Sequence, residues 1–413
     1  MRSELKYIPG LDGIRALAAF LVISTHWPNN MLSLKFGWIG VNIFFVLSGF
    51  LITRILLNEK QNHFKDYIST FYYKRFLRIF PLYYAFLCCA FVLILLLTFL
   101  YPSLLNYQEW KSAYNATKHD FIYYLTYTYN IKINLRYFIH FPDSSNRFFG
   151  HLWSLSLEEQ FYILFPLLVY FASLKILKRI VIAVIIICPL IRLWGVFYGA
   201  PMVSDSYWFG ELFYSNTFLQ ADALCTGAAL AIFDIKQAKP YITFFITGAA
   251  WLGAGIFCFY FLRKTGYFLV PAKSLGYDFP GFWFGEKTPY WFINIRPFYQ
   301  YTLVNILAAA LVLPAINGKL LFPKVFANKG VAYLGKISYG IYIFHNPLLA
   351  LFIILAEMNW GGWGKLTGTP LAEITCFVIY VGVVIAIAHL SYQYFEKRIL
   401  KYKYALKPAP VNA

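Results

Sequence analysis

Long apolar segments, separated by shorter polar ones, run along the whole chain. Ten of them are long enough to cross a bilayer, whose hydrocarbon core takes about 20 helical residues. The pattern therefore predicts an all-α fold, a polytopic membrane bundle of about ten transmembrane helices. The expected spans are residues 11–28, 37–57, 79–101, 152–173, 179–198, 210–233, 240–262, 298–316, 331–357 and 370–395.

Lysine and arginine residues are unevenly distributed among the segments that join these spans. Most of the 36 fall on the side that also holds the N-terminus, and the cytoplasmic loops of membrane proteins carry such an excess. Both termini are therefore expected in the cytoplasm. We explain the net charge of +18 by this topology and expect no nucleic-acid partner.

Composition predicts an integral membrane protein, with a bacterial inner membrane as the expected setting. Hydrophobic residues make up 60% of the chain and charged residues 13%, whereas soluble domains are about a quarter charged. Residues 1–400 are expected to form one transmembrane domain and residues 401–413 a short basic cytoplasmic tail, without a fused soluble domain. The six cysteines lack metal-ligand spacing, so no metal site is expected.

The first span carries three ionisable residues, Asp12, Arg15 and His26. Such residues are rare inside a bilayer and are usually functional. At about 100° per residue, Arg15 and His26 lie on one face of the helix, about 16 Å apart along its axis. This polar stripe, with the Asp12/Arg15 pair at one end and the imidazole at the other, predicts the wall of a buried reaction or transport site.

A basic run, Lys74, Arg75 and Arg78, precedes the apolar part of the third span. We expect the run to open that helix, so that two arginines three residues apart share a face beside free backbone N–H groups. Forked guanidinium groups in this position favour a phosphate-bearing ligand on the cytoplasmic side. Ordinary positive-inside charge is the alternative explanation.

The fourth span opens with polar residues in helical register. His151, Ser154 and Glu158 share one face of the expected helix. A carboxylate inside a membrane needs a cation, and Arg15 or His26 of the first span is the expected partner of Glu158.

The second and ninth spans add further polar side chains. Asn42 is expected to supply a hydrogen bond beside His26, whereas the neighbouring small residues Gly40, Ser48 and Gly49 allow close helix packing. In the ninth span Tyr342 and His345 lie on one helix face. A hydrogen-bonded packing role is the alternative for this second histidine.

Together these motifs resemble the acyltransferase type 3 family of integral membrane acyltransferases. The resemblance runs from residue 7 to about residue 398 and depends on five elements in order. They are GLDGIRA at 10–16 with His26, GVNIFFVLSGFLI at 40–52, RFLRIFP at 75–81, WSLSLEEQFY at 153–162 and ISYGIYIFH at 337–345.

The resemblance implies a membrane-bound O-acyltransferase. Family members move an acyl group, most often acetyl from cytoplasmic acetyl-CoA, to a hydroxyl of a cell-envelope carbohydrate. The functional residues of the family map onto His26 and Arg15, onto the pair Arg75 and Arg78, and onto Ser156 and Glu158.

The chain departs from the family pattern at three positions. Asn42 stands where the family often has Asp, and Phe161 where it often has Tyr. Gln220 occupies the place of the usual Arg two residues before the acid of the sixth span, here Asp222. Whether this acid ties helices together or serves the site is left open by the sequence.

These observations lead to one expected mechanism. The basic run holds the phosphates of acetyl-CoA, the histidine of the first span removes a proton from a sugar hydroxyl, and Glu158 orients its imidazole. The expected catalytic residues are His26, Arg15, Glu158 and Asp12, the donor-binding residues Arg75, Arg78 and Lys74, and the supporting residues Asn42, Ser156, His151, His345 and Tyr342.

Two other functions remain open. One is a transporter of lipid-linked sugars or small anions, although the sequence has no internal repeat of the kind that transporters often show. The other is an acyltransferase that acts on a lipid or small hydrophobic acceptor. The expected partners are acyl-CoA, a carbohydrate acceptor in free or lipid-linked form, and the lipid bilayer. Direct transfer and a covalent acyl intermediate also remain open.

Overall fold

The described part of the chain is entirely helical or in turns, as predicted. The structure is a computed structural model, and it describes residues 7–28, 31–34, 36–135, 146–198, 212–233, 248–249, 253, 296–318 and 322–404. No strand occurs among these residues. The predicted span at 240–262 and the loop at 263–297 lie outside them, apart from residues 248–249 and 253.

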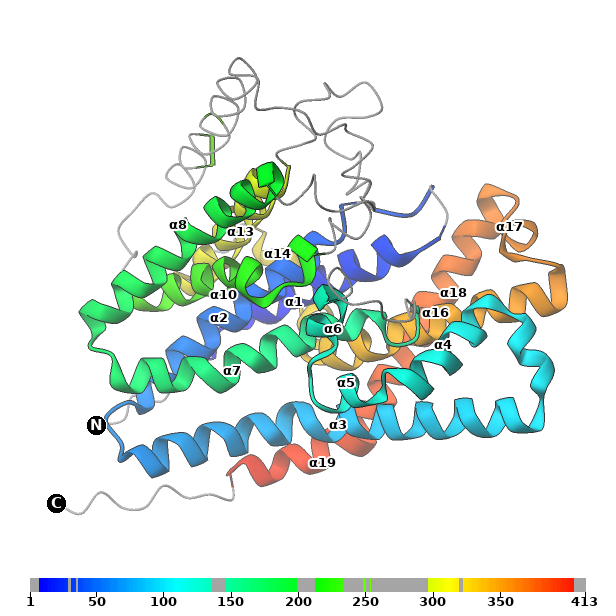
Figure 1. Cartoon of the computed structure of the whole chain (residues 1–413), viewed down its shortest axis with the longest axis horizontal. Coiled ribbons are helices and arrows are strands. Elements are labelled where there is room, and N and C mark those ends of the chain that lie inside the picture. Colours follow the sequence, from blue (N-terminus) through cyan, green and yellow to red (C-terminus); the bar gives the residue numbers. More distant parts are fainter. Residues whose placement is uncertain are drawn as a thin grey trace.

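Long helices follow the order of the predicted spans and lie side by side in Figure 1. Within the described residues, five helices are long and apolar enough to cross a membrane, at Ile39–Glu59, Phe64–Leu100, Phe298–Ile316, Ser338–Trp360 and Pro370–Leu400. The long helices are α1 (Pro9–His26), α2 (Ile39–Glu59), α3 (Phe64–Leu100), α7 (Trp153–Phe171), α8 (Leu174–Tyr198), α10 (Thr217–Ile232), α13 (Arg296–Ile316), α16 (Ser338–Trp360) and α18 (Pro370–Ser391).

Glycines bring α2 and α10 into close contact at the centre of the bundle. A Cβ atom on Gly49 would lie 1.9 Å from the carbonyl oxygen of Leu224, and one on Gly227 would lie 1.9 Å from that of Val46. Neither space admits a methyl group, so the backbones approach as small residues allow in membranes. The packing role of Gly49 expected from the sequence is confirmed.

Helix α3 begins earlier than the sequence predicts. It starts at Phe64 rather than near residue 79 and runs for 37 residues, about 55 Å, which is well beyond the roughly 30 Å core of a bilayer. Arg75 and Arg78 therefore lie in the interior of the helix. The expectation that free N–H groups of a helix N-terminus help to bind an anion here is wrong, because these backbone groups are already hydrogen-bonded within α3.

The predicted ninth span is divided. A short helix, α15 (Lys329–Lys336), ends one residue before α16 starts at Ser338. Helix α15 packs against the start of α1, where a Cβ atom on Gly335 would lie 1.7 Å from the carbonyl oxygen of Asp12. This contact fixes the end of α1 that carries Asp12 and Arg15.

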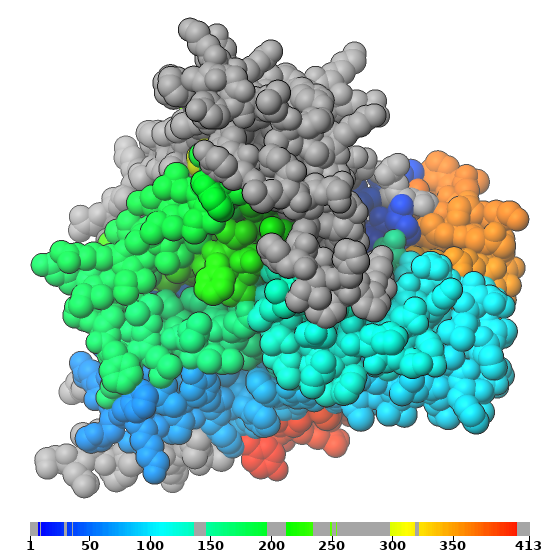
Figure 2. Space-filling model, viewed as in Figure 1, coloured from blue at the N-terminus to red at the C-terminus, as the bar shows by residue number. Residues whose placement is uncertain are grey.

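The described residues between α3 and α7, 101–135 and 146–152, are largely helical. They contain η1 (Pro102–Asn106), α4 (Gln108–His119), α5 (Phe121–Leu125), α6 (Tyr129–Leu135) and η2 (Gly150–Leu152). A buried ion pair between Asp120 and Lys132 joins parts of this segment. Figure 2 shows its residues in cyan as a continuous surface above the blue residues of α3. The segment is thus a folded layer against the bundle.

Candidate active site

Helix α1 carries a polar cluster at its start. The guanidinium of Arg15 donates to a carboxylate oxygen of Asp12 over 2.9 Å, and the phenol of Tyr7 donates to the other oxygen over 2.5 Å. The hydrogen bond to this carboxylate raises the pKa of Tyr7 to about 12. Asp12 therefore holds Arg15 in place, as the pairing in the sequence suggested.

Three imidazoles lie in a row beyond the other end of α1. The ring centroids of His26 and His345 are 5.0 Å apart, and those of His345 and His151 are 4.9 Å apart, both in edge-to-face contact. His345 and His151 are buried, whereas His26 is half-buried. The row joins α1, α16 and the turn before α7, three elements that are distant in sequence.

Backbone carbonyl groups set the tautomer of each imidazole. Nδ1 of His26 lies 2.8 Å from the carbonyl oxygen of Val22, and Nδ1 of His345 lies 2.6 Å from that of Tyr342. A carbonyl oxygen only accepts, so both Nδ1 atoms carry the proton. In the neutral rings Nε2 is then the basic nitrogen. In His151 the roles are reversed, because its Nε2 lies 3.2 Å from a carbonyl oxygen.

That carbonyl belongs to Ile343, and a proline makes it available. Proline has no N–H, so Pro347 cannot donate to the carbonyl four residues before it in α16. The carbonyl of Ile343 accepts from His151 instead. A local rule of helix chemistry thus explains how one imidazole is oriented.

The row ends in a hydroxyl pair. Tyr342 donates its phenol hydrogen to the carbonyl oxygen of His151 over 2.8 Å. Its oxygen lies 2.5 Å from the hydroxyl of Ser154. Within the described residues, Nε2 of His345 and Nδ1 of His151 are buried without a hydrogen-bond partner. The row therefore presents basic nitrogens and no donor to satisfy them.

An arginine covers the end of α1 beside the row. Nη1 of Arg147 lies 3.5 Å from the carbonyl oxygen of His26, and its Nε donates to Glu109 over 2.7 Å. A cation at this place is favourable because the carbonyl end of a helix carries partial negative charge. The layer between α3 and α7 thus contacts the site directly.

Glu158 lies with the arginines rather than with the imidazoles. Its carboxylate accepts from Ser48 over 2.6 Å and from Tyr162 over 3.2 Å. The charges of Arg75 and Arg15 act on it, and the guanidinium of Arg75 lies 5.1 Å from the ring centre of Tyr162. The hydrogen bonds described for this carboxylate thus come from Ser48 and Tyr162, whereas Arg15, one of its two expected partners, acts on it through its charge.

The three arginines Arg15, Arg75 and Arg78 form one positive region. The charge of Arg15 acts on both others, and Glu396 offsets part of the charge at Arg78. Lys74 is half-buried on the same helix. Since α1 carries Arg15 at one end and His26 at the other, this region and the imidazole row lie at opposite ends of one helix.

Asn42 lies away from His26, in a different polar cluster. Its amide donates to Gln220 over 3.2 Å and to Asn305 over 2.9 Å. The expectation of a hydrogen bond beside the imidazole is not met, because the side chain points to α10 and α13. Ser156 uses its hydroxyl within α7, on the carbonyl oxygen of Leu152.

Beside this amide cluster a buried ion pair joins three helices. Arg192 of α8 donates to both carboxylate oxygens of Asp222 in α10, over 3.1 and 2.6 Å, and to Thr302 of α13 over 3.0 Å. Asp222 thus ties helices together. In the part of the chain that the structure describes, no three His, Cys, Asp or Glu side chains are grouped so as to hold a metal ion.

Comparison with known proteins identifies the family of the chain. A family described as an acyltransferase domain matches residues 8–392. The chain belongs to the acyltransferase type 3 family. The two departures Asn42 and Gln220 from the pattern of this family are in direct contact, so that a pair of neutral amides stands where other members often carry Asp and Arg.

Two curated relatives of this acyltransferase come from Listeria monocytogenes and Staphylococcus aureus. The chain is 28% identical to peptidoglycan O-acetyltransferase OatA of Listeria monocytogenes, over 97% of its own length and 57% of the relative. It is 28% identical to O-acetyltransferase OatA of Staphylococcus aureus, over 96% and 58%. The chain thus spans less than three-fifths of these relatives. No solved structure matches it.

Sequence reasoning missed the residues that depend on long-range contact. Arg147 and Glu109 have no helical register to His26, and only the fold brings them to it. Ser48 was noted only as a small packing residue, yet its hydroxyl holds Glu158. The sequence does indicate that Ser48 forms a hydrogen bond, because a hydroxyl in an apolar helix needs a partner.

Proposed function

We propose that this acyltransferase is an O-acetyltransferase that moves acetyl from cytoplasmic acetyl-CoA to a hydroxyl of a cell-envelope carbohydrate. One observation carries the proposal: α1 joins an arginine region to an imidazole base at points about 16 Å apart. The Listeria relative is named a peptidoglycan O-acetyltransferase, which supports a carbohydrate acceptor. The setting is a bacterial cytoplasmic membrane, with both termini on the cytoplasmic side.

The arginine region receives the phosphates of the donor. Arg15, Arg75 and Arg78 repel one another, and an anion among them offsets this repulsion. Guanidinium forks suit phosphate oxygens, and Lys74 adds a further cation. Glu158, held by Ser48, balances part of the charge while the site is empty of donor.

The imidazole end performs the transfer. The acceptor oxygen attacks the thioester carbonyl carbon, and Nε2 of His26 takes the hydroxyl proton as the C–O bond forms. The C–S bond breaks, and the same nitrogen returns the proton to the thiolate, which leaves as CoA. General-base assistance of this kind contributes about 10²- to 10⁴-fold. Asp12 acts indirectly by fixing Arg15.

His345 and His151 support the base. When His26 takes the proton it becomes positive, and the lone pair on Nε2 of His345 faces this part of the site without a donor of its own. A preorganised acceptor beside a charge that forms during the reaction stabilises it. Tyr342 and Ser154 hold the far end of the row.

The test is transfer of labelled acetyl from acetyl-CoA to envelope glycan in membranes that contain the native chain or a variant. We expect His26→Ala to lower transfer by about 10²- to 10⁴-fold at equal protein level. Arg75→Ala with Arg78→Ala should raise the KM for acetyl-CoA and recover at high donor concentration. His119→Ala and Lys65→Ala, both at exposed positions, are the matched controls.

Normal transfer by His26→Ala would exclude the proposed base. If the native chain consumes no acetyl-CoA and acetylates no glycan, the enzyme assignment is wrong, and movement of labelled lipid-linked sugar or a small anion across vesicles tests the transport alternative. Transfer to lipid in place of glycan would point to the hydrophobic acceptor.

A further inference from the structure

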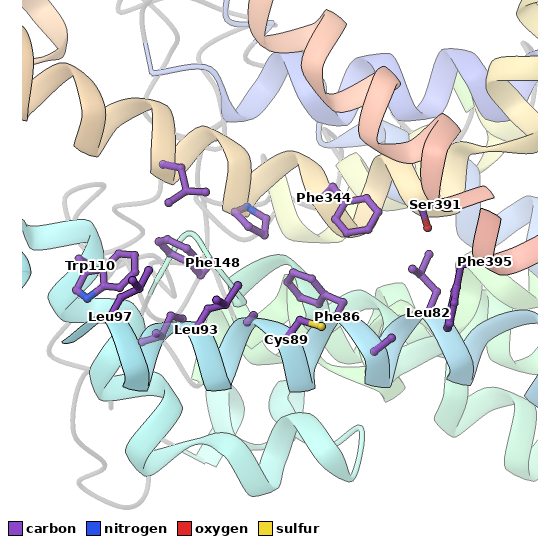
Figure 3. Close-up of a pocket in the computed structure, with 15 residues that line it drawn as sticks. Leu82, Phe86, Cys89, Leu93, Leu97, Trp110, Phe148, Phe344, Ser391 and Phe395 are labelled. Atoms are coloured by element: carbon purple, nitrogen blue, oxygen red, sulfur yellow. The ribbon is translucent and has the colours of Figure 1, made fainter. Parts of the chain in front are cut away.

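A long apolar cavity lies between α3 and α16, on the side of α16 away from the bundle centre (Figure 3). Its volume is about 380 Å³. Fifteen residues form its wall, and they share an almost complete lack of polar atoms. They are Leu82, Ala85, Phe86, Cys89, Ala90, Leu93, Ile94, Leu97, Trp110, Phe148, Phe344, Pro347, Leu351, Ser391 and Phe395.

The wall excludes both of the polar substrates discussed above. A sugar ring carries several hydroxyls, and the pantetheine arm of CoA carries two amides. Burying such groups without hydrogen bonds costs several kcal/mol each. The wall supplies one hydroxyl, on Ser391, and one thiol, on Cys89. A hydrocarbon chain is the ligand chemistry that fits.

The cavity reaches the lipid-facing surface. Among its lining residues, Leu93, Leu351 and Phe395 are exposed large hydrophobics. From Leu82 to Leu97 it follows α3 for fifteen residues, or about 22 Å. Half the hydrocarbon core of a bilayer measures about 15 Å, so the cavity is longer than one leaflet. A hydrocarbon chain that lies along α3 can therefore occupy the cavity from end to end.

One end of the cavity adjoins the imidazole site. Trp110 and Phe148 close this end, with ring centroids 6.1 Å apart. The residues immediately before them, Glu109 and Arg147, form the ion pair that touches the carbonyl of His26. On each of the two segments, adjacent residues thus have different roles. Trp110 and Phe148 close the cavity, whereas the ion pair of Glu109 and Arg147 contacts the site.

We propose that the cavity binds the hydrocarbon chain of a polyprenyl-phosphate-linked glycan, which is the acceptor in lipid-linked form. This inference rests on the proposed function and names the form in which the carbohydrate arrives. With the chain along α3, the head group emerges beside Arg147, whose side chain is 37% exposed and which supplies a cation for the lipid phosphate. The first sugars then lie at His26.

The first experiment measures binding without any reaction. The full chain is placed in vesicles of phosphatidylglycerol and phosphatidylethanolamine that contain a polyprenyl phosphate with a photoreactive group on its chain. We expect crosslinks on residues 82–97 and on Trp110. Ala90→Phe fills the cavity and should reduce them at least tenfold. Val92→Phe, on the same helix but outside the lining, should leave them unchanged.

A phospholipid that carries the same photoreactive group shows whether the cavity prefers a polyprenyl chain to an ordinary lipid tail. If it labels these residues as strongly and competes with the polyprenyl probe, the cavity is a general lipid groove and the proposal is overturned. Crosslinking that Ala90→Phe does not reduce would also overturn it, because the chain would then lie elsewhere.

The second experiment compares two acceptors of identical sugar structure, one soluble and one linked to polyprenyl phosphate. Ala90→Phe should lower acetyl transfer to the lipid-linked acceptor at least tenfold and leave transfer to the soluble one unchanged. An equal loss with both would mean that the substitution damages the fold, and the proposal fails. If the native chain acetylates neither while crosslinking remains sensitive to Ala90→Phe, lipid binding stands and the proposed enzymatic function fails.

Discussion

Two clusters of polar side chains lie inside this bundle, the amide and ion-pair cluster and the imidazole row. They differ in how completely their donors and acceptors are paired with one another. The amide and ion-pair cluster sets donors against acceptors, with Arg192 on Asp222 and Asn42 on Gln220. Its remaining unpaired atoms include both a donor, on Asn305, and an acceptor, on Asn42. The imidazole row leaves two basic nitrogens, and both are acceptors.

The difference separates a structural role from a functional one. An unpaired buried acceptor costs about 1–3 kcal/mol, so a row of them is retained only where something else completes it. In the proposed reaction His26 takes the proton of the acceptor hydroxyl, and the positive charge that forms on it is what the unpaired Nε2 of His345 stabilises. The cluster of α2, α8, α10 and α13 needs no such partner and holds helices together. Substitutions should therefore affect stability in one region and activity in the other.

The largest effect is expected at the ion pair. Asp222→Asn leaves Arg192 with a charge that is fully buried and unbalanced, which costs about 3–5 kcal/mol. Replacing both residues, with Arg192→Met and Asp222→Leu, should be much less harmful because no charge remains. Thermal unfolding of the purified protein in detergent measures both. A double variant as unstable as the single one would contradict the structural role.

The amide pair allows a sharper test. Asn42→Asp or Gln220→Arg alone places one charge in a buried cluster and should destabilise the protein by a few kcal/mol. Together they place opposite charges at two positions whose side chains are in contact, so that an ion pair can form. The double variant should recover about 0.5–3 kcal/mol relative to the sum of the single effects. Strict additivity would mean that the two side chains are not coupled.

In the imidazole row the effect should appear in the rate. His345→Asn keeps a donor in the place of Nδ1 for the carbonyl of Tyr342 but removes the basic nitrogen, so kcat should fall about tenfold, or about 1.4 kcal/mol. His345→Gln, which puts an acceptor near the position of Nε2, should lose less. Unfolding temperature should stay close to that of the native chain in both. A parallel fall in stability would assign His345 to packing.

The smallest effect is expected for Pro347→Ala, which should raise the unfolding temperature and lower the rate of acetyl transfer. Pro347→Ala restores an N–H that can donate to the carbonyl of Ile343, so α16 regains a hydrogen bond and the unfolding temperature should rise slightly. His151 then competes for its acceptor, and acetyl transfer should fall a few-fold. Ala350→Ser, one turn further along α16, serves as the control. Activity that rises together with stability would contradict the role of the proline.

The sequence predicted much of the fold because hydropathy reports membrane crossing directly. It placed α2 within two residues at each end and α7 equally well. It misplaced the start of α3, where polar residues continue a helix outside the bilayer and hydropathy carries no signal. It also missed the break at Ile337. Only this one apolar residue separates α15 from α16, so the hydropathy of the segment shows no interruption.

The site was predictable where its members share a helix face. The register of Asp12 and Arg15 led directly to their ion pair. Contacts between helices were not predictable, because hydropathy does not fix which faces meet. Glu158 and Asn42 were therefore brought together with His26 in the expected scheme, whereas packing turns one toward Arg75 and the other toward Gln220. A single sequence contains no measure of such rotations.

Pro347 has a mechanical consequence. The two halves of α16 are joined at this point without the backbone hydrogen bond that spans Ile343 and Pro347. Helices bend most readily at such positions. Pro347 follows His345 by two residues and also forms part of the cavity wall. The point at which α16 bends most readily therefore borders both the imidazole row and the cavity.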